Sequence, residues 1–185
     1  MHFGWHWLPN ILTLVRFALI VPFAIALNRG QFMLALGLFM LAAISDGADG
    51  FLARRFGWFS RFGAIADPLA DKALLLTTYA MMALTDLIPD WLLIVIVARD
   101  LLIVTGALAY HFLIGRYQMS PSLLGKANTF IQILFVVIVM AEYAGLSVPD
   151  FAVPMGIYLV ALSTALSGFH YVVVWSLRAR REAQA

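Results

Sequence analysis

Six long apolar stretches constrain this chain more than any other feature of its sequence. A helix that spans a bilayer needs about 20 apolar residues, and stretches of this kind lie at 8–27, 32–53, 63–84, 89–113, 123–145 and 151–177. Hydrophobic residues make up 63% of the chain and charged residues only 12%, which is outside the usual composition of soluble domains. The sequence therefore predicts an all-α integral membrane protein. We expect a single domain, 1–185, with six transmembrane helices in a bundle and a short N-terminal interfacial segment.

The basic residues predict how the helices are oriented. Arginine and lysine gather in the second and fourth connections and in the C-terminal tail, whereas acids mark the third and fifth connections. The positive-inside rule then places both termini in the cytoplasm, in the inner membrane if the source is bacterial. No basic segment precedes the first apolar stretch, so we expect no signal peptide. The net charge of +2 is modest, and a basic cytoplasmic rim suits membrane lipids and phosphate groups better than nucleic acid.

Four aspartates interrupt the apolar stretches. Asp46 and Asp49 lie near the cytoplasmic end of the second stretch, and Asp67 and Asp71 near that of the third. Their spacings of three and four residues put each pair on one face of a helix. Four carboxylates in a low-dielectric site need countercharge. Because the chain has no cysteine and no histidine nearby, oxygen ligands favour Mg²⁺ or Mn²⁺ over zinc, and four carboxylates could hold two ions.

Small residues around the aspartates have two interpretations. Glycine and alanine permit close approach, either of one membrane helix to another or of a ligand to both helices. A packing face alone leaves the four charges unexplained. An ion-conducting protein would need polar residues along a whole path, whereas these charges gather at one face of the membrane. Both non-enzymatic alternatives, conduction and a purely structural role, are therefore less favoured than a ligand site.

The aspartates belong to a longer motif over residues 46–71. It reads Asp46-x-x-Asp49-Gly50-x-x-Ala53-Arg54, then eight residues, then Gly63-x-x-x-Asp67-x-x-x-Asp71. This pattern resembles the complete signature of the CDP-alcohol phosphotransferase family, the class I CDP-alcohol phosphatidyltransferases. The resemblance extends along the chain through the six stretches, Pro9-Asn10-x-x-Thr13 and Gly125-Lys126.

The resemblance implies transfer of a phosphatidyl group from CDP-diacylglycerol to an alcohol, with release of CMP. By the family pattern, Asp46 and Asp67 would bridge two metal ions, Asp49 and Asp71 would each complete one site, and Asp71 would act as the general base. The positions matching the CDP-diacylglycerol site are Asn10, Ile11, Leu12, Thr13, Gly50, Ala53, Arg54, Ser60 and Gly63. Arg54 could alternatively be a positive-inside anchor. The resemblance also implies a homodimer.

Three further basic residues are candidates for binding the phosphate of the acceptor: Arg16, Arg99 and Lys126. A cation inside a span usually has an anionic partner, so Arg99 could alternatively pair with Asp100. Two acceptors are considered, phosphatidylglycerol and glycerol-3-phosphate, and both carry a phosphate.

The branches of the family differ in the residues after Arg99. Members that make phosphatidylglycerophosphate usually carry a second arginine about two helical turns beyond it, where this chain has Thr105-Gly106-Ala107-Leu108. The segment Gly125-Lys126-x-Asn128-Thr129 is more similar to the eukaryotic-type cardiolipin synthases, which use phosphatidylglycerol. We therefore favour phosphatidylglycerol as the acceptor, with glycerol-3-phosphate as the alternative. His170, Tyr171 and Trp175 are interpreted as interfacial residues without a catalytic role.

Overall fold

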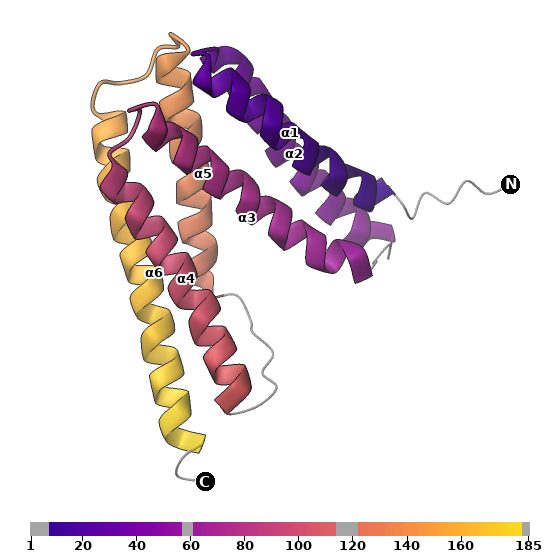
Figure 1. Cartoon of the computed structure of the whole chain (residues 1–185), viewed down its shortest axis with the longest axis vertical. Coiled ribbons are helices and arrows are strands. Elements are labelled where there is room, and N and C mark those ends of the chain that lie inside the picture. The colour runs from indigo at the N-terminus through magenta and orange to yellow at the C-terminus, as the bar shows by residue number, and fades with distance from the viewer. Residues whose placement is uncertain (1–7, 57–60, 114–121, 183–185) are drawn as a thin grey trace, which may run out of the picture. The chain divides into compact units, whose positions relative to one another are not determined.

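The computed structural model describes residues 8–56, 61–113 and 122–182, and this part of the chain is entirely helical (Figure 1). Its six helices are α1 (Leu8–Asn28), α2 (Phe32–Phe56), α3 (Arg61–Leu84), α4 (Asp90–Leu113), α5 (Leu123–Tyr143) and α6 (Ala152–Glu182). They coincide with the six apolar stretches to within a few residues, except that α6 continues five residues further. The all-α prediction is therefore confirmed for the described residues.

Three of the helices are long and apolar enough to cross a membrane: Ile11–Asn28 in α1, Leu123–Tyr143 in α5 and Ala152–Trp175 in α6. A shorter apolar segment, Phe32–Gly47, lies in α2. The aspartates shorten the apolar part of α2 and charge the start of α3, and α4 carries Arg99 and Asp100 near its middle. The described residues thus contain three candidate spans, which fit a membrane protein, and the six-span bundle stays a prediction.

The described residues form two compact units. The first comprises α1, α2, α3 and the segment Val139–Val148, and within it α1 packs against both α2 and α3. Its core combines large and small side chains: the ring centroids of Phe23 and Phe39 lie 6.1 Å apart, and Ala35 and Ala42 are fully buried. Small residues let the helices approach closely, which brings the polar side chains of α1 within reach of those on α2 and α3.

The second unit comprises α4, most of α5, and α6. Two glycines set the distances between its helices. Gly106 of α4 lies directly against Trp175 of α6, because an added Cβ would come within 1.7 Å of the indole ring, and Gly156 of α6 lies similarly against Phe135 of α5. Each aromatic ring fills the space that a side chain at the glycine would need, which explains why these positions carry none.

Three of the helices end in the same way. At the ends of α1, α3 and α5, Gly30, Asp86 and Gly145 adopt positive φ angles, and the next residue donates its N–H to a carbonyl five positions earlier. This Schellman arrangement satisfies carbonyl groups that the helix leaves open and reverses the chain in a short turn. Asp86 adopts φ 57° without being a glycine, which aspartate tolerates better than most residues.

Candidate active site

The first unit holds an arginine between two of the motif aspartates. Arg16 lies on α1 with a fully buried side chain, and its Nη1 atom is 2.6 Å from Oδ1 of Asp71 on α3 and 3.1 Å from Oδ1 of Asp46 on α2. One cationic nitrogen therefore joins carboxylates from two helices that are separate in sequence. The side chains of Asp46 and Asp71 are 45% and 43% exposed. The positive charge of Arg16 therefore lies within the packed helices, whereas the two carboxylates are accessible at the surface of this unit.

A second contact repeats this pattern one helical turn away. Thr13, also fully buried on α1, donates its hydroxyl hydrogen to Oδ1 of Asp67 on α3. Thr13 and Arg16 are three residues apart and Asp67 and Asp71 four, so one face of α1 meets one face of α3 in register. We call this group of five residues, Thr13, Arg16, Asp46, Asp67 and Asp71, the aspartate cluster.

The structure thus joins two of the four predicted metal ligands, Asp46 and Asp71, through Arg16, and a third, Asp67, contacts Thr13 of the same helix. Asp49 and several predicted donor-site residues lie outside the described side chains, namely Asn10, Gly50, Ala53, Arg54, Ser60 and Gly63. Of the remaining donor-site residues, Thr13 is in the aspartate cluster, Ile11 is exposed and Leu12 is partly buried. Their assignment to CDP-diacylglycerol stays a prediction.

The carboxylate oxygens of the aspartate cluster are ligands of the kind that a divalent cation takes. The Nη1 atom of Arg16 already places positive charge between two carboxylate oxygens, and oxygen is the ligand that Mg²⁺ and Mn²⁺ prefer. Among the described side chains, no three of the ligand types histidine, cysteine, aspartate and glutamate form a group that could hold a metal ion. The predicted set of four includes Asp49, which is not among them. The donors that are present are compatible with a hard metal ion.

Sequence reasoning grouped Arg16 with the acceptor site and missed its contacts with Asp46 and Asp71. The partners of Arg16 could have been predicted in part. A cation in an apolar helix needs an anionic partner, and the nearest acids at the same depth in the membrane are the motif aspartates. Arg16 belongs to the first unit, whereas Arg99 and Lys126 belong to the second. A single phosphate pocket formed by all three stays a prediction.

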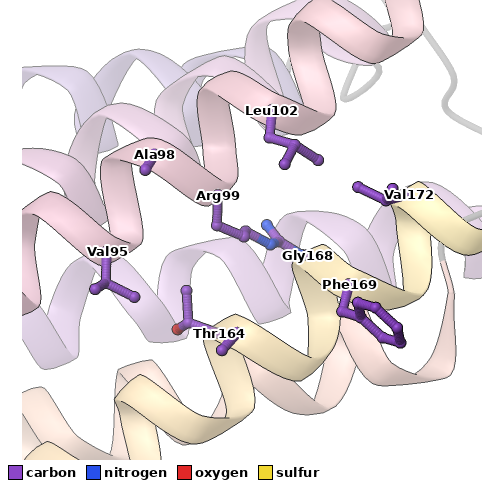
Figure 2. A pocket seen from close by; sticks show the side chains of 9 residues that line it. Val95, Ala98, Arg99, Leu102, Thr164, Gly168, Phe169 and Val172 are labelled. Atoms are coloured by element: carbon purple, nitrogen blue, oxygen red, sulfur yellow. The ribbon is translucent and has the colours of Figure 1, made fainter.

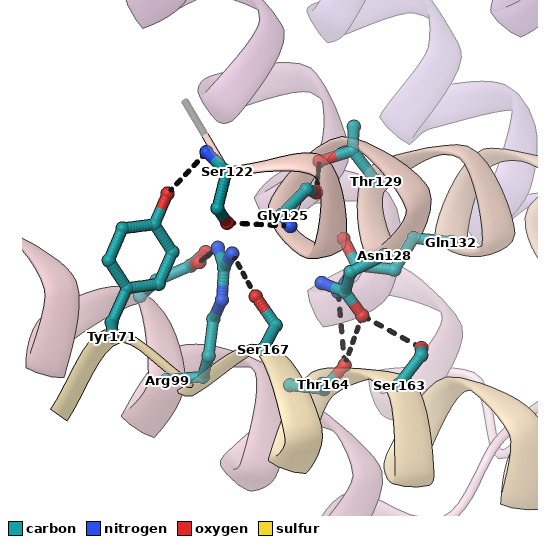
Figure 3. Close-up of polar contacts among 11 residues, drawn as sticks. Arg99, Ser122, Gly125, Asn128, Thr129, Gln132, Ser163, Thr164, Ser167 and Tyr171 are labelled. Carbon is teal, nitrogen blue, oxygen red and sulfur yellow. Dashed lines mark hydrogen bonds and ion pairs between the residues drawn. The ribbon is translucent and has the colours of Figure 1, made fainter. Parts of the chain in front are cut away.

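In the second unit, Arg99 of α4 is held on three sides (Figure 3). Its Nη1 atom lies 2.9 Å from Oδ1 of Asp100, its Nη2 atom donates to the Ser167 hydroxyl at 2.7 Å, and its guanidinium carbon lies 5.8 Å from the ring centroid of Tyr171. The alternative pairing with Asp100 is therefore present. Only 11% of the Arg99 side chain is exposed, so its three contacts give the guanidinium a defined position.

The start of α5 lies beside this arginine. Ser122 caps the helix, because its hydroxyl oxygen accepts the N–H of Gly125 at 3.0 Å, and its own N–H donates to the Tyr171 hydroxyl at 3.4 Å. Lys126 follows with an exposed side chain. Arg99 and Lys126 thus belong to the same unit, and Arg99 lies close to the residue that precedes Lys126.

An apolar groove next to Arg99 is lined by residues of α4 and α6 (Figure 2). It has a volume of about 350 Å³, and Arg99 and Thr164 are its polar lining residues. The stem of Arg99 crosses it toward Gly168, where an added Cβ would lie 3.4 Å from Cγ of the arginine. The groove therefore gives the arginine stem an apolar environment.

The family model for CDP-alcohol phosphatidyltransferases matches residues 6–176. Cardiolipin synthase (CMP-forming) of Homo sapiens is 30% identical over 186 residues, covering 89% of this chain and 60% of the human protein. The CDP-diacylglycerol–glycerol-3-phosphate 3-phosphatidyltransferase of Bacillus subtilis (strain 168) is 30% identical over 180 residues, covering 89% of this chain and 92% of the relative. A probable phosphatidylglycerophosphate synthase of Mycobacterium tuberculosis (strain ATCC 25618 / H37Rv) is 32% identical over 172 residues, covering 89% and 79%.

These relatives fall into two groups with similar identity to this chain. The chain spans between 56% and 60% of the length of the cardiolipin synthases that it matches. Enzymes of the matching family serve phospholipid biosynthesis and generally depend on a divalent metal. The match covers nearly all of the sequence, including every motif aspartate, the first five helices and most of α6. The chain therefore belongs to the CDP-alcohol phosphatidyltransferase family.

Proposed function

We propose that this protein transfers the phosphatidyl group of CDP-diacylglycerol to the hydroxyl of phosphatidylglycerol, giving cardiolipin and CMP. The observation that carries the proposal is the aspartate cluster: the complete family motif supplies the aspartates, and α1 joins Asp46, Asp67 and Asp71 through Arg16 and Thr13. Membership of the family supports the reaction type. The proposed setting is the cytoplasmic edge of the membrane, and the proposed assembly is a homodimer.

In the proposed reaction, the acceptor hydroxyl attacks the phosphorus of the phosphatidyl group and the bond to CMP breaks. Asp71 would accept the hydroxyl proton as general base. Asp46, Asp49, Asp67 and Asp71 would hold two Mg²⁺ or Mn²⁺ ions, which supply charge neutralisation on the phosphoryl oxygens. Thr13, by donating to Asp67, would orient that carboxylate. Arg54, Gly50 and Ser60 would contact the donor nucleotide.

The contact between Gly106 and Trp175 supports phosphatidylglycerol over glycerol-3-phosphate as the acceptor. Gly106 is one of the four residues, Thr105-Gly106-Ala107-Leu108, that stand where the phosphatidylglycerophosphate branch usually carries a second arginine, and the Trp175 ring leaves no room for a side chain at Gly106 itself. A small acceptor with a dianionic phosphate would lose one cationic contact. Relatives of both branches match this chain, so glycerol-3-phosphate is kept as the second candidate.

A product assay on the purified protein tests the proposal. CDP-diacylglycerol and Mg²⁺ or Mn²⁺ would be supplied with phosphatidylglycerol or with glycerol-3-phosphate in separate reactions, and the lipids resolved by mass. We expect cardiolipin and CMP from the phosphatidylglycerol reaction. If the other reaction gives phosphatidylglycerophosphate instead, the proposed mechanism stands and the acceptor is glycerol-3-phosphate. No metal-dependent CMP release from either reaction would contradict the enzymatic proposal and favour a conducting or structural role.

A further inference from the structure

The groove of the second unit is lined by residues of two sizes, and we call it the α4–α6 groove (Figure 2). Ala98, Ala165 and Gly168 are small, whereas Leu102 and Phe169 are large and keep 37% and 69% of their surface exposed. Small side chains beside larger ones leave a depression on the surface of these two helices. Its volume of about 350 Å³ lies at the lower end of the range for small-ligand pockets.

The polar ends of the two polar lining residues have partners elsewhere. The guanidinium of Arg99 bonds Asp100 through Nη1 and donates to the Ser167 hydroxyl through Nη2. The hydroxyl of Thr164 donates to Oδ1 of Asn128 at 3.0 Å. The surface of the groove is therefore almost entirely apolar. A charged or polar ligand would lose its hydration there without gaining hydrogen bonds, so the complementary occupant is apolar.

The dimensions of the α4–α6 groove fit a lipid chain better than a helix. On α6 it covers residues 164–172, which lie inside the candidate span Ala152–Trp175, so in a bilayer it faces hydrocarbon. On α4 it covers residues 95–102, a length of about 10 Å. A helix is itself about 10 Å wide, and a stable protein interface buries more than about 1,000 Å². A groove of about 350 Å³ is too small for that, whereas a single acyl chain is narrow enough to enter it.

The charges of this unit indicate which lipid supplies the chain. The groove is lined by Arg99, and Lys126 belongs to the same unit, whereas the aspartate cluster belongs to the first unit. Arg99 and Lys126 are cations predicted to bind the phosphate of the acceptor. A phospholipid whose phosphate meets these cations would have its acyl chains next to the groove. Phosphatidylglycerol is such a lipid, whereas glycerol-3-phosphate has no chain to place there.

We propose that the α4–α6 groove holds one acyl chain of the acceptor phosphatidylglycerol and thereby selects a lipid acceptor. This inference rests on the proposed function and deepens it, because it assigns a site to the part of the acceptor that carries no charge. The chains of the bilayer are as apolar as the groove, so the hydrophobic effect does not favour either place. The groove adds close packing contacts, which orient the acceptor and contribute a modest affinity.

Ala165→Leu tests the groove by filling it. Leu166→Phe is the matched control, because it adds the same number of carbon atoms at the next residue, which is 51% exposed and does not line the groove. We expect Ala165→Leu to raise the KM for long-chain phosphatidylglycerol by about fivefold, as the loss of packing contacts alone implies. The KM for short-chain phosphatidylglycerol, the KM for CDP-diacylglycerol and kcat should not change. Leu166→Phe should leave all four values unchanged.

Phe169→Ala tests the groove in the opposite way, by removing one of its walls. The side chain is 69% exposed, so its loss should leave the thermal midpoint close to that of the unchanged protein. The KM for long-chain phosphatidylglycerol should again rise, and that for the short-chain lipid should not. The inference is overturned if Ala165→Leu affects both lipids equally, or if neither Ala165→Leu nor Phe169→Ala raises the KM for the long-chain lipid.

A binding readout separates this inference from the reaction itself. Phosphatidylglycerol with a photoreactive group in its acyl chain is added to the protein in phosphatidylcholine nanodiscs, and the labelled peptides are identified by mass spectrometry. Labelling of residues 95–102 and 164–172 should occur in the unchanged protein and in Leu166→Phe, and should fall several-fold in Ala165→Leu. That result supports the groove even if no cardiolipin forms, in which case only the proposed function fails. Equal labelling by a phosphatidylcholine probe, or labelling that Ala165→Leu does not reduce, counts against the groove and leaves the catalytic proposal intact.

Discussion

Arg16 contributes more to the site than a single charge. Its buried guanidinium lies within 3.1 Å of carboxylates on both α2 and α3, so it holds the two halves of the motif together through α1. Without the arginine, the carboxylates of Asp46 and Asp71 would face each other with no shared cation, and their repulsion would be uncompensated. Arg16 also competes with a metal ion for the same carboxylates. Replacing the arginine should therefore lower the stability of the metal-free protein and raise its affinity for a metal ion.

Arg16→Gln should therefore lower the thermal midpoint without metal and strengthen metal binding. A unit charge about 4 Å away contributes several kcal/mol even at an intermediate dielectric constant, so we expect the apparent Kd for Mn²⁺ to fall by at least about tenfold. Calorimetric titration of Mn²⁺ and melting curves with and without Mn²⁺ measure both effects. Arg16→Lys keeps the charge and serves as the control. Weaker Mn²⁺ binding in Arg16→Gln would show that the arginine orders the ligands rather than competing for them.

Asp71→Asn tests the proposed general base. The amide keeps the shape of the side chain but can neither accept the proton nor provide a carboxylate ligand, so turnover should fall by about 10²–10⁴-fold. Arg16 keeps Asp46 as a partner, and we expect the fold and much of the CDP-diacylglycerol binding to persist. Single-turnover CMP release and donor binding are measured together, with Asp86→Asn in the α3–α4 turn as the control. Activity within a few-fold of the unchanged protein would refute the role of Asp71.

At the scale of helices, the contact between α4 and α6 depends on the absence of a side chain. Gly106 and Trp175 are 69 residues apart in sequence, and the indole ring occupies the space that any Cβ at 106 would enter. Arg99 lies two turns earlier on the same helix, with its stem passing Gly168 of α6. Gly106 lets the Trp175 ring pack against α4 and therefore helps to set the distance between α4 and α6 near Arg99.

Gly106→Ala should destabilise the protein by about 1–3 kcal/mol, because inserting a methyl group into a packed contact forces the ring or the helix to move. Gly37→Ala is the matched control, since nothing lies within 4 Å of the added methyl group and alanine favours the helix by about 1 kcal/mol. Thermal unfolding of both variants in the same detergent gives the comparison. If Gly106→Ala melts no lower than Gly37→Ala, the Trp175 contact does not constrain the two helices.

For the whole molecule, the sequence predicted the helices well because each long apolar run has one low-energy structure in a bilayer. Hydropathy did not show that α6 continues to Glu182, because the last residues of the helix are polar and lie beyond the apolar stretch. The partners of Arg16 and the contacts of Tyr171 with Arg99 and Ser122 also escaped prediction. Both depend on which helices pack together, and no periodicity within one helix contains that information.

The orientation of the molecule can be measured directly because the chain has no cysteine. An introduced cysteine is then the only thiol, and a membrane-impermeant maleimide reports the side on which it lies. Gln31 and Ser147 are exposed in the α1–α2 and α5–α6 connections, and Arg55 is exposed near the end of α2. The positive-inside rule predicts that Gln31→Cys and Ser147→Cys are labelled in intact cells, whereas Arg55→Cys is labelled only after permeabilisation. Labelling of Arg55→Cys from outside would place the motif aspartates at the outer face and contradict a cytoplasmic active site.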